Sequence, residues 1–124
     1  MVIGFHKQFV PLIKSGSKIH TIRIDKHNRW KAGMKMHMPT GVRTKKYKQF
    51  CGTLTCISIQ NIQIIYYDSI MYHYAEVFID GNKLSEKKVN ELAINDGFKD
   101  KADFFKWFKK DFTGKIIHWT DKKY

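Results

Sequence analysis

The sequence predicts an α+β fold, with flanking helices around a small, mostly antiparallel sheet of about five or six strands. Three observations support this prediction. A chain of 124 residues without a linker, repeat or low-complexity tract is typical of a single domain, here 1–124. Apolar residues make up 43% of it, which is enough for one core. Alternating, strand-like stretches come before and after a helical region, and closure into a β-barrel would remove the edges of such a sheet.

The first elements are a short strand over residues 1–5 and a helix over residues 6–16. Phe9, Leu12 and Ile13 have helical spacing, and Gly16 is a typical helix end. Pro11 is compatible with this helix only in its first turn.

Strands are predicted over residues 18–24, 34–41 and 72–80. In the first, β-branched residues alternate, so that Ile22 and Ile24 face the core while Thr21 and Arg23 share the opposite face. Residues 25–33 form a polar loop and residues 42–48 a basic loop or hairpin. The β-rich run 50–67 is expected to break or bend near Asn61, and the strand over 72–80 ends at an Asp-Gly turn.

Two helices are predicted after that turn, followed by a last strand over residues 114–120. Ser85 is a candidate N-cap of the first helix, and Asp100 is one for the second. The second helix is expected to carry phenylalanines at helical spacing as far as Phe112. The residues expected to be buried are Phe5, Phe9, Leu12, Ile22, Ile24, Leu54, Leu92, Phe104 and Phe108.

The charge of the chain indicates a polyanionic partner. Lys and Arg number 23 against 11 acidic residues, giving a net charge of +12. Such an imbalance favours nucleic acid over a basic protein without a nucleic-acid role. The loops over residues 25–33 and 42–48 each combine several cations with one aromatic ring. Such a ring can stack on an unpaired base. The candidate RNA-binding residues are Lys26, Arg29, Trp30, Lys31, Arg43, Lys45, Lys46, Tyr47 and Lys48. The alternative is a pair of solvated loops, each anchored by its aromatic residue, with Trp30 plugging the barrel end.

The stretch "GSKIHTIR" and the order of the elements resemble the ASCH family of the PUA-like superfamily. The family pattern G-x-K-x-x-T-I-R falls on residues 16–23, and "KAGMKMHM", "NDGF" (taken as the start of a helix), "FFKWFKKDF" and "IIHWT" extend the resemblance over essentially the whole chain. The resemblance implies a small PUA-like β-barrel with flanking helices and a cleft, and an association with RNA and modified nucleosides.

The resemblance also implies candidate site residues. In hydrolase members that act on N4-acetylcytidine, the motif lysine and threonine work with an acidic residue. The corresponding positions here are Lys18, Thr21 and Asp96, although those hydrolases carry a glutamate in place of the aspartate. Thr21 would be the nucleophile and Lys18, with its pKa lowered by burial and by Arg23, the activating base. Arg23 would bind a phosphate or carboxylate. The alternatives are an ordinary strand threonine and a helix cap at Asp96.

Three functions remain open at this level: a module that binds RNA or a flipped base, a hydrolase for an N4-acylated cytidine, and a ribonuclease. The net charge favours RNA, because a hydrolase of free nucleosides does not need it. The six His residues lack metal-ligand spacing, so we expect no metal and no cofactor. No apolar segment suits a bilayer and no signal peptide is recognised, so we expect a cytoplasmic protein without membrane contact, acting as a monomer.

Overall fold

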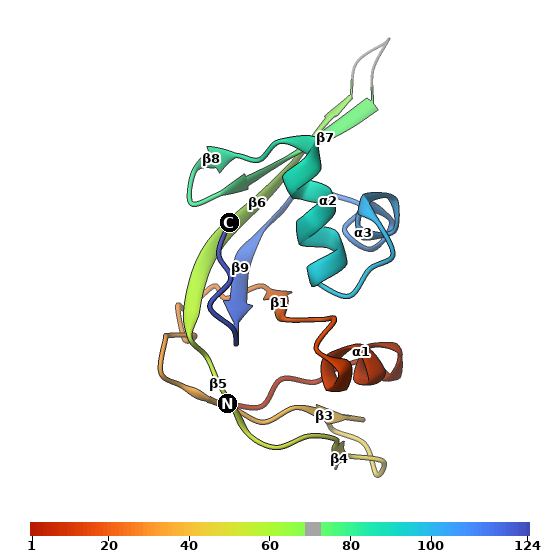
Figure 1. The fold of residues 1–124 in the computed structure, drawn as a ribbon, viewed down its shortest axis with the longest axis vertical. Helices are drawn as coiled ribbons and strands as arrows, with labels where there is room; N and C mark the ends of the chain where they lie inside the picture. Colours follow the sequence, from red (N-terminus) through yellow and green to blue (C-terminus); the bar gives the residue numbers. More distant parts are fainter. Residues whose placement is uncertain (69–72) are drawn as a thin grey trace.

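A five-stranded antiparallel sheet forms the centre of the computed structural model, which describes residues 1–68 and 73–124. The order of its strands is β1-β9-β6-β7-β8 (Figure 1). These strands are β1 (His20–Arg23), β6 (Ser58–Asp68), β7 (His73–Ile79), β8 (Asn82–Lys83) and β9 (Phe112–His118). The α+β class predicted from the sequence is confirmed.

The remaining elements lie at the two ends of this sheet (Figure 1). Helices α2 (Glu86–Asn95) and α3 (Lys101–Trp107) pack beside its upper part. The lower end holds a short 3-10 turn η1 (Lys7–Phe9), helix α1 (Val10–Ser15) and two small antiparallel pairs. These pairs are β2 (Lys35–Met36) with β5 (Leu54–Thr55), and β3 (Pro39–Thr40) with β4 (Lys48–Gln49).

The described residues form no closed barrel. The five-stranded sheet has β1 and β8 as its two edges, and these two strands do not pair with each other through backbone hydrogen bonds. The lower end of the molecule is instead covered by α1 and the two small sheets, so separate elements fill the place that barrel closure would have occupied (Figure 1).

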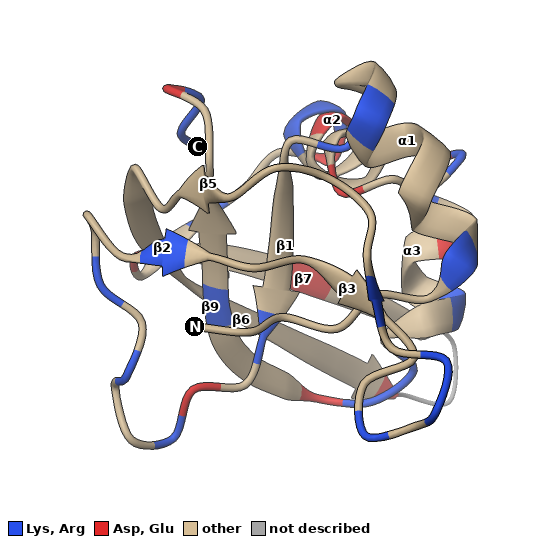
Figure 2. Ribbon diagram, turned by 90° about the horizontal axis from the view of Figure 1, so that it is seen from below, with Lys and Arg blue, Asp and Glu red and all other residues tan. Residues whose placement is uncertain are grey.

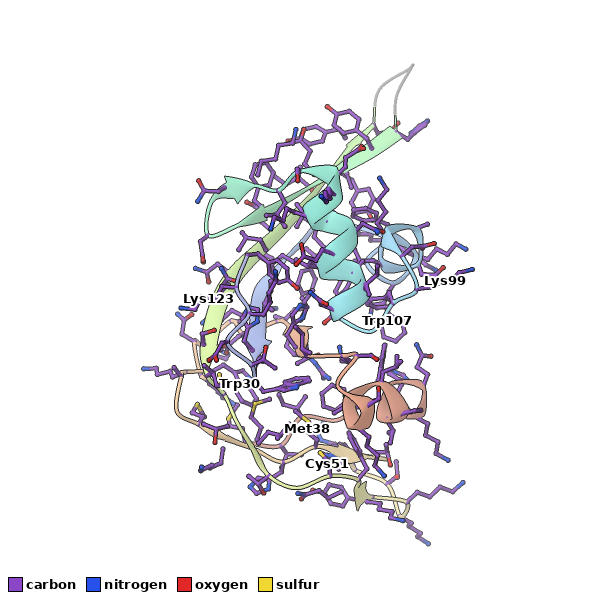
Figure 3. The ribbon with its side chains drawn as sticks, in the orientation of Figure 1. Trp30, Met38, Cys51, Lys99, Trp107 and Lys123 are labelled. Atoms are coloured by element: carbon purple, nitrogen blue, oxygen red, sulfur yellow. The ribbon has the colours of Figure 1, made fainter. Side chains whose placement is uncertain are left out.

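Two hydrophobic clusters form the core, and β9 passes between them. Ile116 packs with the upper cluster, which includes Ile64, Leu92 and Phe104, whereas its neighbour Ile117 packs with the lower cluster. Side chains of successive strand residues point to opposite faces, so one strand serves both clusters. Trp30 and Met38 lie inside the lower cluster (Figure 3).

Both helix caps predicted from the sequence are present. The Ser85 hydroxyl accepts a hydrogen bond from the Lys88 N–H at 3.3 Å, and the Asp100 carboxylate accepts one from the Asp103 N–H at 3.0 Å. The second helix is shorter than expected, because it ends at Trp107 and Phe112 already belongs to β9. Pro11 lies in the first turn of α1, and Gly16 ends that helix with φ +83°, both as expected.

Several details of the strands differ from the prediction. Residues 1–5 form no strand and make only an isolated bridge between Val2 and His37. The long run does not break near Asn61, since β6 continues through it in register with β9, and the interruption lies instead between β5 and β6 at residues 56–57. The predicted strand over residues 34–41 is divided into β2 and β3. Ile24 is 60% exposed, because β1 ends at Arg23 and the alternation of faces ends with it.

The expected core is otherwise largely correct. Phe5, Phe9, Ile22, Leu92 and Phe104 are buried. The three that are only half-buried are Leu12, Leu54 and Phe108. In the described part of the chain, no helix has both the length and the apolar character needed to cross a bilayer.

Candidate functional site

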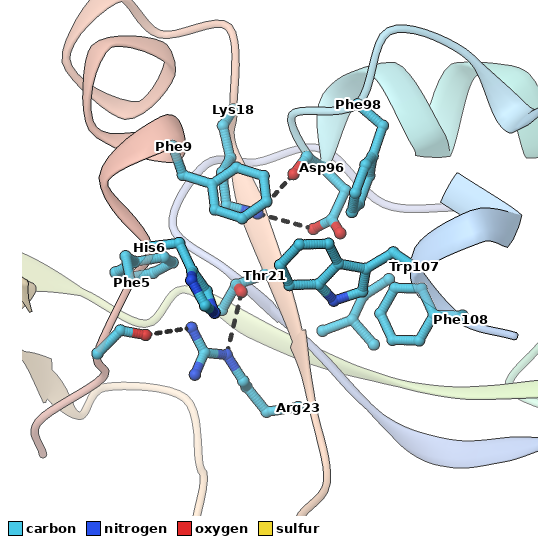
Figure 4. A pocket seen from close by; sticks show the side chains of 12 residues that line it. Phe5, His6, Phe9, Lys18, Thr21, Arg23, Asp96, Phe98, Trp107 and Phe108 are labelled. Carbon is cyan, nitrogen blue, oxygen red and sulfur yellow. Dashed lines mark hydrogen bonds and ion pairs between the residues drawn. The ribbon is translucent and has the colours of Figure 1, made fainter. Parts of the chain in front are cut away.

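A pocket of about 200 Å³ lies where β1, the segment before α1, the turn after α2 and the end of α3 meet (Figure 4). Lys18, Thr21, Arg23 and Asp96 all line it. The convergence of these four residues in one cleft, expected from the motif and from the acidic residue of "NDGF", is therefore present in the structure. The volume is below the roughly 300–1,000 Å³ of drug-sized ligand pockets and suits a single small ring or group.

Backbone hydrogen bonds bring Lys18 and Asp96 together although 78 positions separate them. The chain leaves α1 at Gly16, and the Lys18 N–H then bonds the Leu12 carbonyl at 3.0 Å. The next N–H, that of Ile19, bonds the carbonyl of Asn95 at 2.9 Å. The residue before β1 is thus tied to the last residue of α2, which sets Lys18 beside Asp96.

Asp96 belongs to the end of α2 and does not open the following helix. The Phe98 N–H bonds the Ala93 carbonyl and the Gly97 N–H bonds the Ile94 carbonyl, both at 3.0 Å, which is the Schellman pattern of a helix C-terminus. The interpretation of "NDGF" as a helix start, with Asp96 as a possible cap, is therefore wrong. The cap of α3 is Asp100, and the Asp96 carboxylate points into the site instead.

Gly97 is required at this turn for two reasons. Its φ of +99° is a conformation that L side chains rarely adopt. A Cβ placed there would also lie 3.1 Å from Cδ of Lys18 and 3.1 Å from Cδ1 of Phe9. The glycine therefore both ends the helix and leaves room for the lysine.

Lys18 and Asp96 form a buried ion pair at the inner end of the pocket. The Lys18 Nζ donates to the Asp96 backbone carbonyl at 2.6 Å and to Oδ1 of its carboxylate at 3.1 Å, and the side chains are only 3% and 4% exposed (Figure 4). The ammonium also lies 4.9 Å from the centre of the Phe9 ring. Burial lowers the pKa of Lys18, and the Asp96 carboxylate offsets part of that effect.

His20 supports Asp96 from behind the pocket. Its Nδ1 lies 3.1 Å from the same Oδ1 of Asp96, and its Nε2 lies 2.7 Å from the hydroxyl of Tyr124. That hydroxyl also accepts from the Asn95 amide at 2.9 Å. The two ring nitrogens of His20 thus join the Asp96 carboxylate to the Tyr124 hydroxyl. The Asp96 carboxylate is therefore held on one oxygen by both Lys18 and His20.

His20 was missed in the analysis of the sequence, although it stands within the motif. His20 does not have the spacing to another histidine that is typical of metal ligands. Alternation along β1 places His20 on the face opposite to Thr21 and Arg23, and this was the signal that could have marked it as a residue behind the site. Its partner Tyr124 is far away in sequence and gave no signal.

Thr21 and Arg23 lie side by side on the pocket face of β1. Nε of Arg23 donates to the Thr21 hydroxyl at 3.3 Å, and Nη2 donates to the Gly4 carbonyl at 2.7 Å (Figure 4). The guanidinium stacks over the Phe5 ring at 4.9 Å, and burial lowers the pKa of Arg23. These two bonds use two of its five N–H groups, so others remain for an acceptor on a ligand.

The walls of the pocket are aromatic. Phe5, Phe9, Phe98, Trp107 and His6 surround the polar residues (Figure 4). Trp107 is 46% exposed and contacts Phe9 and Phe98 at 5.5 and 5.7 Å between ring centres. The site thus combines flat apolar walls with charged hydrogen-bonding groups at its base.

None of the residues of the two basic loops lines this pocket, and the loops lie on opposite sides of the lower end (Figure 2). Eight of their nine candidate residues are exposed: Lys26, Arg29, Lys31, Arg43, Lys45, Lys46, Tyr47 and Lys48. The exception is Trp30, which is 7% exposed and packs in the lower cluster. Its ring cannot stack on a base, so for Trp30 the core-anchoring interpretation is correct, whereas Tyr47 is 49% exposed.

The two other large hollows of the surface lack buried charged groups of the kind found in this pocket. These hollows, of about 550 and 570 Å³, lie along β7 and α3, and the charged residues at their surfaces are not buried. Among the described residues, no group of three or more His, Cys, Asp or Glu is arranged to hold a metal ion. Comparisons of the chain with models of protein families, with curated proteins and with solved structures find no match.

Proposed function

We propose that this protein is a PUA-like domain of the ASCH type that binds RNA or a modified nucleobase, with the base entering the pocket of Lys18, Thr21, Arg23 and Asp96. The observation that carries the proposal is the convergence of a buried cation–carboxylate pair, a hydroxyl and a guanidinium between aromatic walls. A nucleobase needs flat apolar faces and donors and acceptors at its edge, and the pocket supplies both.

The polar groups match the edge of an aminopyrimidine such as cytosine. Lys18 and His20 both bind Oδ1 of Asp96. No described residue forms a hydrogen bond or ion pair with the other oxygen, Oδ2, which is left to accept from an exocyclic amino group. The N–H groups of Arg23 that have no partner among the described residues supply donors for a ring carbonyl or a phosphate. Uracil, which offers a carbonyl in place of the amino group, would leave Oδ2 without a donor.

A second candidate function is hydrolysis of an N4-acylated cytidine in the same pocket. The observation that favours it is that the buried Lys18, whose pKa is lowered by burial, lines the same pocket as the Thr21 hydroxyl. In this reaction the Thr21 hydroxyl attacks the acyl carbon and gives its proton to neutral Lys18. The C–N bond then breaks, the amine leaves with that proton, and water hydrolyses the acyl-threonine. Asp96 would help as acid or base, and Arg23 would orient the substrate.

The test measures binding and turnover with the same variants. Calorimetric titration with cytidine, uridine and N4-acetylcytidine gives affinity, and chromatography follows release of cytidine from N4-acetylcytidine beside cleavage of a short RNA. We expect cytidine to bind more tightly than uridine, and Asp96→Asn to remove that preference. If neither nucleoside binds and RNA binding is unchanged in Asp96→Asn, the pocket does not take a base.

Substitutions at Thr21 separate the two candidates. Thr21→Ser keeps the hydroxyl and Thr21→Val keeps the shape of the strand residue. If the protein is a hydrolase, the serine variant retains activity, and the valine variant loses it while still binding cytidine. Lys18→Ala should then reduce the rate by at least about 10²-fold, the lower end of general acid–base effects. Absence of turnover by the wild type leaves a binding pocket, and cleavage of the RNA alone would make the protein a ribonuclease.

A further inference from the structure

The net positive charge of this protein comes almost entirely from its first 67 residues. They contain twelve Lys and Arg and one acidic residue, Asp25, whereas residues 68–124 contain eleven Lys and Arg and ten acidic residues. The first segment therefore contributes +11 of the net +12. Besides β1 and most of β6, this segment forms α1, both small sheets and the two basic loops, so most of its Lys and Arg lie at the lower end of the molecule (Figures 1 and 2).

Asp25 adds no exposed negative charge to this end. Its side chain is 4% exposed and accepts hydrogen bonds from the N–H groups of Arg29 and Trp30, both at 2.9 Å. The Lys115 ammonium, from β9, lies 3.2 Å from the same carboxylate. No exposed carboxylate side chain therefore remains among residues 1–67 to neutralise their surface cations.

A groove of about 410 Å³ runs between α1 and the β3–β4 hairpin at this end. Three lysines line it, Lys7 and Lys14 from the helical segment and Lys48 from β4, together with the apolar surface of Pro11 and Phe50. All three lysines are exposed, and none forms an ion pair with a described residue. The loop that joins β3 to β4 extends the basic surface with Arg43, Lys45 and Lys46.

We propose that this groove binds the phosphate backbone of single-stranded RNA. Several cations along a concave track match a chain of regularly spaced phosphates, and each contact releases a counterion. The exposed ring of Tyr47, 49% accessible, and the half-buried Phe50 offer stacking faces, which an unpaired strand can use and a lipid headgroup or a paired helix cannot.

The groove and the pocket lie on two sides of the same short helical segment. His6 and Phe9 face the pocket, whereas Lys7, Val10 and Lys14 face the groove. The diameter of a helix, about 10–12 Å, separates them. A strand held by the groove can therefore reach the pocket with a nearby base. This link rests on the proposed function of the pocket, whereas backbone binding by the groove does not.

The test compares two triple variants that remove the same charge. Lys7→Gln/Lys14→Gln/Lys48→Gln alters the groove. Lys87→Gln/Lys99→Gln/Lys123→Gln alters three exposed lysines of the other half, none of which pairs with a described residue; Lys99 and Lys123 point outward in Figure 3. Fluorescence anisotropy with a labelled oligouridine measures the dissociation constant over a series of salt concentrations.

We expect the groove variant to flatten the slope of log K against log salt by about 2, because each of three lost phosphate contacts contributes about 0.7. The control variant should change this slope by less than about 0.7, the contribution of one contact. Equal effects of the two variants would overturn the groove and leave only a general attraction. A duplex RNA or anionic lipid vesicles binding as tightly as the oligouridine would overturn the single-stranded partner.

The nucleoside titration separates this inference from the proposed function. The groove variant should bind cytidine as the wild type does, because none of its substitutions lines the pocket. Loss of RNA binding with unchanged cytidine binding supports the groove. Unchanged RNA binding by the groove variant overturns the groove, whatever the pocket binds.

Discussion

The buried pair of Lys18 and Asp96 is the residue-scale feature on which the site depends. Removing one partner of such a pair leaves an uncompensated charge in a dry environment, which typically costs about 3–5 kcal/mol. We expect Lys18→Met and Asp96→Asn each to destabilise the fold by an amount of this order. In the double variant neither charge of the pair remains without its partner, so the combined loss should be smaller than the sum.

Urea denaturation of the four proteins measures this coupling. If the loss of unfolding free energy in the double variant equals the sum of the losses in the two single variants, the two charges do not stabilise each other. The same curves are needed to interpret the activity tests, because rates must be compared per folded molecule.

Gly97 provides a second residue-scale prediction. Gly97→Ala introduces a side chain at φ +99° and against Lys18, whereas Gly81→Ala at φ +85° has open space around the new Cβ. Both should lose about 1–2 kcal/mol from the left-handed backbone. Only Gly97→Ala should also weaken binding in the pocket, because Lys18 must move. Equal ligand affinity of the two variants in calorimetry would contradict the close approach of Gly97 to Lys18.

His118 makes the stability depend on pH. It is fully buried, its Nε2 donates to the Gln60 side chain at 3.0 Å, and its Nδ1 has no partner among the described residues. Burial, with the charge of nearby His20, lowers the pKa of His118 to about 4 from 6.5. Between these values the unfolded chain binds a proton that the folded protein does not.

The stability should therefore be complete above about pH 6.5 and fall as the pH drops toward 4, by at most about 3 kcal/mol from this residue. His118→Gln keeps a donor for Gln60 but does not titrate. Urea denaturation of both proteins between these two pH values should give curves that approach each other as the pH falls. A constant difference would mean that His118 does not carry this dependence.

At the scale of elements, α3 matters because its last residue, Trp107, and the following Phe108 line the pocket. Helix α3 has only seven residues, so its N-cap is a large part of its stability. We expect Asp100→Ala to cost about 1 kcal/mol and to speed amide exchange throughout α3, while Asp100→Asn, which can still cap, has little effect. Equal exchange in the two variants would show that packing alone holds the helix.

At the scale of the whole molecule, β9 joins two hydrophobic clusters into one unit. Ile116 and Ile117 are both fully buried but belong to different clusters. Each substitution to Ala should cost about 2–5 kcal/mol. Because the clusters share this strand, each variant should still unfold in one transition, with circular dichroism and hydrogen exchange of Val77 and Met36 changing together. Exchange that rises only around Met36 in Ile117→Ala would reveal two independent units.

Charge also acts at this scale. The lower end of the molecule carries nearly all of the excess positive charge and the upper part is almost balanced, so the molecule has one electrostatically attractive end. Such a distribution orients a polyanion before contact and makes the association rate sensitive to salt.

The sequence determined the features of this protein that depend on neighbouring residues. Periodicity identified both later helices, Ser85 and Asp100 marked their caps, and Gly16 marked the end of α1. The motif named Lys18, Thr21 and Arg23, which do share a pocket. These signals are local because a helix, a cap or a strand face is set within a few residues. The same kind of signal was misread at "NDGF", where a glycine after the last apolar position is typical of a helix end.

Only the tertiary structure decided which distant groups meet. The bond between Ile19 and Asn95 places Lys18 beside Asp96, and the packing of Tyr124 makes His20 part of the same network. Burial of Trp30 and exposure of Ile24 likewise depend on where a loop turns, and the open sheet depends on which strands find partners. Such contacts join residues far apart in the chain, and no local pattern records them, because their free energy comes from burial and pairing in the assembled fold.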